Sequence, residues 1–216
     1  MKRVSIKRLF AYSFAASLSV ILSVFLMDLS SRAYGEPVDR VVASSFGYDA
    51  SDATQALQEA IDSGAHTVYV DRQSGPWYVR PLTLRSHLEL VFEEGVELVA
   101  KSGEFRDKGA VLLRCEGVED VTIRGEGRGA TLRMHKREYW QEPYEKSEWR
   151  HGISLLSAKD VSIENLQIAE TGGDGIYVGV SGSLHEPCRN IRVVGVDCVE
   201  NNRQGISVIS VDGLLV

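Results

Sequence analysis

One eight-residue frame occurs three times in the second half of the chain, and it restricts the fold more than any other feature. It reads RHGISLLS at 150–157, GGDGIYVG at 172–179 and RQGISVIS at 203–210. In each copy a glycine precedes an isoleucine and a short β-prone run, which is typical of a half-buried strand. A frame that returns at a short interval predicts a repeat architecture.

A second β-prone run follows each copy of the frame, and the two series keep similar intervals. The first series begins at Gly109, Gly152, Gly175 and Gly205, with spacings of 43, 23 and 30 residues. The second begins at Val121, Val161, Ile191 and Leu214, with spacings of 40, 30 and 23 residues. A unit of about 22–25 residues with loop insertions explains both series.

Units of this size contain several strands and no helix, so each must stack on the unit before it. We therefore expect an all-β parallel solenoid, in which equivalent strands of successive coils pair about 4.8 Å apart. The alignment predicts two interior columns, Ile153–Ile176–Ile206 and Leu155–Val178–Val208. Earlier β-type runs lie at 66–70, 77–79, 82–84, 88–92, 96–100, 110–113, 120–123 and 130–134.

One amphipathic helix is expected ahead of these strands, at 52–63. Its apolar face has helical spacing and consists of Ala53, Ala56, Leu57, Ala60 and Ile61. Ser51 or Asp52 can cap its start, and Gln55 fits a capping box with Asp52. A short helix of this kind needs an apolar partner, and we expect it to close the open end of the solenoid.

The first 35 residues have the pattern of a secretory signal peptide. Basic residues precede an apolar stretch at 9–27, and Ala33 and Gly35 fit a cleavage site. The alternative is an uncleaved membrane anchor, because the apolar stretch is long. We expect a secreted, periplasmic or cell-surface protein with a linker at 36–48 and a β-helix domain at 49–216. The chain stops at VDGLLV without a polar cap, so we expect the domain to be C-terminally incomplete.

Charge and cysteine content restrict the partners. Without residues 1–35 the chain has 19 basic and 29 acidic residues, since five of the 24 basic and one of the 30 acidic residues lie there. This balance argues against nucleic acid as a partner. Cys115, Cys188 and Cys198 are expected in the core, with a Cys188–Cys198 disulfide as the alternative. No metal-ligand spacing is present, and we expect no metal, no cofactor and a monomer.

Three stretches carry a family resemblance. FGYDASDATQALQEAIDSGAHTVYV at 46–70 resembles the opening of pectate-lyase-like right-handed parallel β-helix proteins, and PLTLRSHLELVFEEGVELVA at 81–100 resembles their next coils. EWRHGISLL, GGDGIYVG and NNRQGISVIS resemble a secreted bacterial branch of them. The resemblance runs from about residue 46 to the end. It implies a right-handed parallel β-helix, but this fold hosts lyases, hydrolases, epimerases and non-enzymes.

The motifs of the best-known activities in this group are missing. The polygalacturonase branch has an NTD motif, a paired DD motif, a GHG motif and an RIK motif, whereas this chain has a single DG at 174–175. The chain also has no acidic cluster like the one with which pectate lyases hold calcium. The resemblance therefore implies carbohydrate chemistry but does not select one particular activity.

Stacking places the residues before each glycine in a ladder. We expect His151, Asp174 and Gln204 on adjacent rungs, with Arg150 and Arg203 about 10 Å apart beside an open slot at Gly173. The candidate catalytic residues are Asp174, His151 and Tyr177, which could transfer protons. The candidate substrate-binding residues are Arg150, Arg203, Gln204, Trp149, Trp140 and Tyr144. The alternatives are that Asp174 makes a turn, that the arginines pair with nearby acids, and that the aromatic loop at 134–150, which interrupts the repeat and supplies Trp140, Tyr144 and Trp149, packs onto the solenoid.

Two functions fit these residues. The first is an enzyme acting on an acidic polysaccharide by lyase, epimerase or hydrolase chemistry in a groove along the β-helix. Arginine can hold a uronate carboxylate, whereas a hydrolase needs two carboxylates and the ladder contains one. The second is a non-catalytic glycan-binding or structural β-solenoid.

Overall fold

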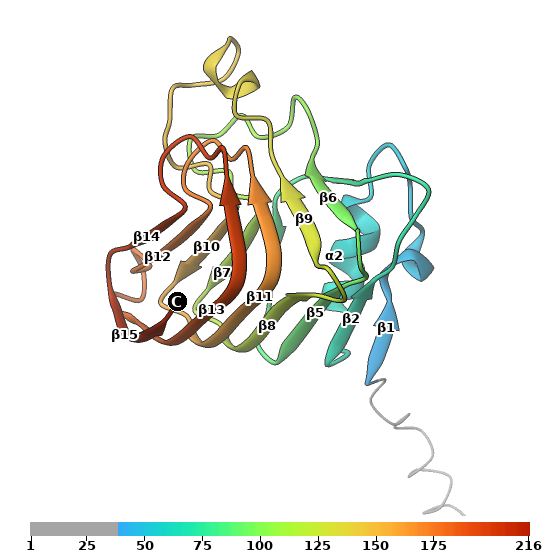
Figure 1. Cartoon of the computed structure of the whole chain (residues 1–216), viewed down its shortest axis with the longest axis horizontal. Coiled ribbons are helices and arrows are strands. Elements are labelled where there is room, and N and C mark those ends of the chain that lie inside the picture. The colour runs from blue at the N-terminus through green and yellow to red at the C-terminus, as the bar shows by residue number, and fades with distance from the viewer. Residues whose placement is uncertain (1–38) are drawn as a thin grey trace, which may run out of the picture. The chain divides into compact units, whose positions relative to one another are not determined.

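The fold is a curled stack of parallel strands (Figure 1). The structure is a computed structural model that describes residues 39–216, so the predicted signal peptide lies outside the described residues. The strands form three faces, because the longer sheet bends along β11 (Lys159–Ala169) and β13 (Cys188–Val199). The first half of β11 pairs with β8 (Glu119–Gly125) and its second half with β9 (Ala130–Arg133). The expected right-handed parallel β-helix is thereby confirmed.

Two faces belong to one ten-stranded sheet. Besides β8, β11 and β13, the first face contains β1 (Arg40–Val42), β2 (Thr67–Val70), β5 (Leu88–Phe92) and β15 (Val211–Leu215). Besides β9 and the second halves of β11 and β13, the second face contains β3 (Trp77–Val79) and β6 (Glu97–Ala100). β1 lies inside the segment expected as a linker.

The third face is a separate five-stranded sheet, called here the site sheet because it supports the candidate functional site. It contains β4 (Leu82–Thr83), β7 (Leu113–Glu116), β10 (Ile153–Leu156), β12 (Ile176–Gly179) and β14 (Ile206–Val208). These strands stack in that order and all pair in parallel.

The strand register confirms the alignment of the two predicted columns, but their interior position holds only for the earlier coils, because Val208 in the last coil is 44% exposed. Ile153 pairs with Ile176 and Ile176 with Ile206, while Leu155, Val178 and Val208 form the next column. The second series is also in register, from Val121 through Val161 and Ile191 to Leu214. The first residues of the two columns, with Val161 and Ile191, lie in one buried apolar core.

One member of the glycine series was aligned wrongly. Ile153 pairs with Leu113, and the amide of Leu113 donates to the carbonyl of Gly152, so Gly109 does not start the coil. Gly109 instead lies in a loop at 101–112. The strand expected at 110–113 is correspondingly displaced to 113–116.

The expected helix is present as α2 (Thr54–Asp62), and all five residues of its predicted apolar face are buried in the core or against it. The carboxylate of Asp52 accepts the amide of Thr54 at 3.1 Å, but the N-cap position itself is Ala53, which has no side-chain cap. The predicted capping box is wrong, because the side chain of Gln55 bonds Glu59 instead. A 3₁₀-helix, η1 (Ala43–Phe46), precedes α2.

The three cysteines are all free thiols, with Cys115 and Cys188 buried and Cys198 half-buried. The alternative of a Cys188–Cys198 disulfide is therefore wrong in this structure. Among residues 39–216 no helix is long and apolar enough to cross a membrane.

Candidate functional site

A continuous trough crosses the outer face of the site sheet. It consists of two adjoining hollows of about 410 and 360 Å³, which share Gly109, Val111 and Arg114. The first hollow is also lined by Lys108, Trp149, His151, Ser154, Leu156, Tyr177 and Val180. The second is also lined by Pro81, Leu82, Thr83, Asp107 and Ala110. The trough therefore runs from β4 to β12, along the direction in which the coils stack.

Three aromatic rings gather at one part of the trough. The ring of His151 stacks on that of Tyr177, with centroids 4.8 Å apart and planes 10° apart. Trp149 stands edge-on to both, at 5.8 Å from His151 and 5.6 Å from Tyr177. Its indole is about half exposed, at 52%. Tyr177 can lie against the sheet because Gly179 leaves room: a Cβ there would come within 2.6 Å of the phenol ring.

His151 is buried in a defined hydrogen-bonding state. Its Nδ1 accepts the backbone amide of Asp174 at 2.9 Å, so a neutral ring carries its proton on Nε2. Burial lowers the pKa of His151 to about 4, although the Asp174 carboxylate opposes this shift. Within residues 39–216, Nε2 has no hydrogen-bond partner. The structure thus contains a neutral imidazole with one unused donor beside the trough.

The low pKa of His151 predicts a pH-dependent stability. An unfolded histidine takes up a proton below about pH 6.5, whereas folded His151 does so only near pH 4. The native state should therefore lose stability as the pH falls from 6.5 to 4, on the order of 2 kcal/mol from this residue. Urea unfolding of the wild type and His151→Gln across this range measures the effect. Parallel pH curves for the two proteins would contradict it.

Asp174 is fully buried, at 0% exposure, and lies beneath the trough instead of lining it. One carboxylate oxygen, Oδ1, accepts the backbone amide of Gln204 at 3.1 Å, and Oδ2 lies 3.4 Å from Nδ1 of His151. Oδ2 has no hydrogen-bond partner in the described part of the chain. The expected ladder of His151, Asp174 and Gln204 exists, and the Asp174 carboxylate bonds the next coil.

Arg203 lies between two carboxylates. Its Nε is 3.5 Å from Oε2 of Glu148 and 3.9 Å from Oδ1 of Asp174. Gln204 follows at the surface, and its side-chain oxygen accepts the hydroxyl of Ser207 at 3.1 Å. Neither residue lines the trough, and their role as substrate-binding residues stays a prediction.

The expectation that Arg150 faces the groove is wrong. Its side chain is fully buried and donates to the carbonyls of Phe105, Arg106 and Glu145 at 2.7, 2.7 and 3.0 Å. Arg150 forms an antiparallel bridge with Gly172, and this irregular backbone breaks the strand alternation on which the prediction relied. The open slot at Gly173 is also absent, since a Cβ there would meet the carbonyl oxygen of Glu148 at 2.5 Å and His151 at 2.8 Å.

The aromatic loop that precedes Arg150 is only partly available to a ligand. Tyr144 is buried, its ring packs against Tyr139, and its hydroxyl accepts the amide of Gly103 at 2.9 Å. The expectation that Tyr144 contacts substrate is therefore wrong. Trp140 is 60% exposed and donates to Asn202 at 3.0 Å, but it does not line the trough. Its binding role stays a prediction.

Four polar residues of the trough were missed in the sequence: Thr83, Asp107, Lys108 and Arg114. Arg114 pairs in register with Ser154 on β10, and Ser154 with Tyr177 on β12. The sequence contained a signal for Arg114. If Leu112 instead of Gly109 is aligned with Gly152, RCE at 114–116 aligns with SLL at 154–156, as in the strand register.

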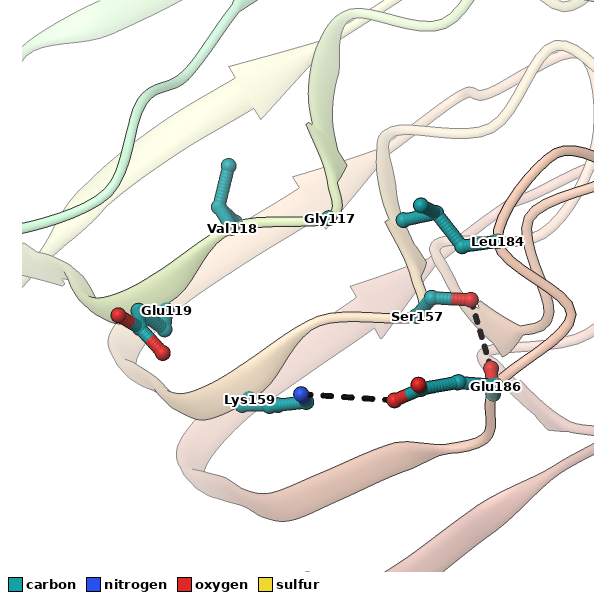
Figure 2. A pocket seen from close by; sticks show the side chains of 7 residues that line it. All are labelled: Gly117, Val118, Glu119, Ser157, Lys159, Leu184 and Glu186. Carbon is teal, nitrogen blue, oxygen red and sulfur yellow. Dashed lines mark hydrogen bonds and ion pairs between the residues drawn. The ribbon is translucent and has the colours of Figure 1, made fainter.

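A smaller hollow of about 200 Å³ lies at the turns between the two sheets (Figure 2). Its polar groups are engaged with each other: Ser157 donates to the carbonyl of Glu186 at 2.6 Å, and Lys159 lies 3.4 Å from the Glu186 carboxylate. Ser157 also accepts the amide of Ser181, which fixes the start of the 180–187 loop. This hollow thus serves to anchor a loop beside the site sheet.

Among residues 39–216 no group of three or more histidine, cysteine or acidic side chains is arranged to hold a metal ion. No protein-family profile matches the chain. Over 104 residues it is 27% identical to the SPbeta prophage-derived uncharacterized protein YorA of Bacillus subtilis. That match covers 45% of this chain and 18% of YorA, so the chain spans only a small part of that relative.

Three solved structures share the fold. A candidate glycosyl hydrolase from Parabacteroides merdae has a TM-score of 0.65 and 17% identity, over 82% of this chain and 84% of that one. A 1,3-α-1,4-β-D-galactose-4-sulfate-3,6-anhydro-D-galactose-2-sulfate 4 galactohydrolase has a TM-score of 0.66 and 18% identity, over 84% of this chain and 44% of that one. An iota-carrageenase complexed to iota-carrageenan fragments has a TM-score of 0.61 and 18% identity, over 84% and 41%. At these identities the likeness concerns the fold.

Proposed function

We propose that this chain is an exported carbohydrate-active protein that binds an acidic polysaccharide along the trough. The observation that carries the proposal is the half-exposed Trp149, which stands against the stacked His151 and Tyr177 rings in the trough. Exposed aromatic faces suit the apolar faces of sugar rings, and such rings dominate contact energies in interfaces. The fold neighbours named as acting on, or bound to, galactan polymers support the same ligand class.

The shape of the trough favours a polymer over a small molecule. It extends across β4, β7, β10 and β12, and neighbouring strands lie about 4.8 Å apart. A chain lying along the trough would thus pass over one coil after another. Trp149 and Tyr177 would then hold one part of the polymer, and the hollow beside Thr83 and Asp107 another part.

The groups near the trough favour lyase or epimerase chemistry over glycoside hydrolysis. A glycosidase needs two carboxyl groups about 5–9.5 Å apart around the scissile bond. Asp107 is the one acidic side chain that lines the trough in the described part of the chain, and Asp174 is buried beneath it. We therefore propose lyase or epimerase chemistry with Tyr177 and neutral His151 as the proton-transfer groups. The galactohydrolase among the fold neighbours favours hydrolysis as the second candidate.

Replacement of Trp149 tests the proposal. Trp149→Ala should weaken polysaccharide binding about 10-fold or more, since an exposed aromatic platform is lost. Trp140→Ala is the matched control, because that indole is also exposed but lies outside the trough. The full chain is expressed in a bacterial host, the exported protein (expected to begin at Glu36) is collected, and binding is measured by calorimetry.

The same protein is screened on sulfated, uronic and neutral polysaccharides for reducing ends and for the absorbance of unsaturated uronates. Unsaturated products would support lyase chemistry, whereas saturated reducing ends would support hydrolysis. Binding without turnover would favour the non-catalytic solenoid. If no polysaccharide binds, or if Trp149→Ala binds as tightly as the wild type, the trough is not the site.

A further inference from the structure

We propose that Arg114 recognises a negatively charged substituent, a sulfate ester or a carboxylate, on the polysaccharide in the trough. This inference rests on the proposed function and adds the chemistry that selects the ligand. Arg114 is one of three residues shared by the two hollows, and the other two, Gly109 and Val111, carry no charge. It therefore lies where the two parts of the trough meet.

The position of Arg114 is fixed by the strand register. It stands on β7 between Thr83 of β4 and Ser154 of β10, and Tyr177 follows on β12. Two strand spacings, about 10 Å, separate Arg114 from Tyr177. Ser154 is largely buried and lines the first hollow beside Arg114. A hydroxyl donor and a guanidinium thus lie side by side on the floor of the trough.

Most of the hydrogen-bonding capacity of Arg114 remains unused. A guanidinium carries five N–H donors, and the described structure shows one hydrogen bond, from Nη2 to the carbonyl of Gly109 at 3.0 Å. Nη1 lies 3.5 Å from Oε2 of Glu116, and both side chains are about one-third exposed. The other Glu116 oxygen accepts the hydroxyl of Ser181 at 2.6 Å, which holds the carboxylate toward the 180–187 loop.

A loose, partly exposed ion pair of this kind contributes little energy. An incoming sulfate or carboxylate can accept two parallel hydrogen bonds from the guanidinium, and this geometry is stronger. Glu116 is therefore a competitor for Arg114, and the ligand anion would displace it. Removal of the Arg114 charge should therefore weaken ligand binding, whereas removal of the Glu116 charge should strengthen it.

The other cations near the trough have shorter or additional contacts. Lys108, which also lines the first hollow, pairs with Glu145 at 2.9 Å in an exposed ion pair. Arg203 lies between Glu148 and Asp174, and Arg150 is buried under the loops. Of these four cations, Arg114 is the one that lines both hollows, and its ion pair, at 3.5 Å, is looser than that of Lys108.

The test compares Arg114→Met, Glu116→Gln and Arg128→Met with the wild type. Arg128 is the matched control: it is 94% exposed on the turn between β8 and β9, pairs with Glu94, and its replacement removes the same charge. Each protein is titrated calorimetrically with a sulfated galactan, a polyuronate and a neutral galactan at low and high salt. Circular dichroism checks that each variant is folded.

We expect Arg114→Met to bind the anionic polymer about 10-fold or more weakly, because a charged hydrogen bond is lost. Glu116→Gln should bind about 2–5-fold more tightly, because the competing charge is gone while its oxygen still accepts from Ser181. Arg128→Met should match the wild type. Affinity should fall with salt. If the sulfated galactan binds more tightly than the polyuronate, sulfate is the recognised group. If the polyuronate binds more tightly, carboxylate is the recognised group.

Two results would overturn the inference while leaving the proposed function standing. These are an Arg114→Met affinity for the anionic polymer like that of the wild type, or a loss of affinity in Glu116→Gln. If Arg114→Met does not fold, Arg114→Lys keeps the charge but loses the planar fork. A several-fold loss of affinity is then expected, and wild-type affinity would contradict the inference. Failure of every polymer to bind the wild type would remove the proposed function itself.

Discussion

Arg150→Ala is expected to lower the free energy of unfolding by about 3–5 kcal/mol, because three backbone carbonyls lose their buried donor and a cavity opens. Its guanidinium is buried and donates to the carbonyls of Phe105, Arg106 and Glu145. Two loops depend on these bonds, 101–112 and the segment that leads to Arg150. The truncation leaves three carbonyls without their donor and also opens a cavity between the loops.

Urea denaturation measures this loss, and hydrogen exchange locates it. Amides in 101–112 and 138–149 should exchange faster in Arg150→Ala, while those of the strands in the site sheet should change less. Arg137→Ala is the control, because Arg137 is exposed on the same segment and its truncation should change stability by less than about 0.5 kcal/mol. Equal stabilities for Arg150→Ala and Arg137→Ala would show that the buried guanidinium does not hold the loops.

The wrong assignment of Arg150 shows where sequence reasoning reached its limit. Repeat alignment predicts which residues share a rung, and His151, Asp174 and Gln204 do share adjacent rungs. It does not predict which way a side chain turns where the backbone leaves the strand. Arg150 lies at such a point, two residues before the buried Gly152, and two of its three partners, Phe105 and Arg106, come from a loop about 45 residues earlier in the chain. Pairings of this kind are set by tertiary packing.

The candidate site was found from the sequence only in part, and for the same reason. His151 and Tyr177 were chosen from the repeat frame and Trp149 from the aromatic segment before it, and the structure brings the three rings together. Arg114 was missed because its coil was aligned on Gly109, which lies in a loop insertion. An insertion next to a repeat shifts the apparent frame without changing the strand pattern. Insertions affected the prediction of the interior columns less, because a strand with apolar residues at alternate positions can bury them in only one register.

Each copy of the repeated frame has a glycine directly before its isoleucine, and in the second copy this is Gly175. Gly175→Ala should lower the free energy of unfolding by about 2–3 kcal/mol. Gly175 does not adopt a positive φ, so its conformation alone does not require glycine. The requirement is space: a Cβ at this position would come within 2.6 Å of the carbonyl oxygen of Gly205 and 2.8 Å of the Cys198 sulfur. The next coil lies there, and its backbone cannot move without disturbing the pairing of β12 with β14.

Gly109→Ala provides the matched control, because the sequence places both glycines in one series and the structure separates them. A Cβ at Gly109 would have no atom within 4 Å, and its φ is not positive. The substitution should therefore be neutral or stabilise the protein by up to about 1 kcal/mol, through a less disordered unfolded chain. Thermal and urea unfolding of both variants show whether glycine is needed for its backbone conformation or for the space it leaves to the next coil. If Gly109→Ala and Gly175→Ala destabilise the protein equally, the close approach of the next coil is not what makes glycine necessary at 175. If only Gly175→Ala does so, the frame glycine marks the positions where one coil must approach the next.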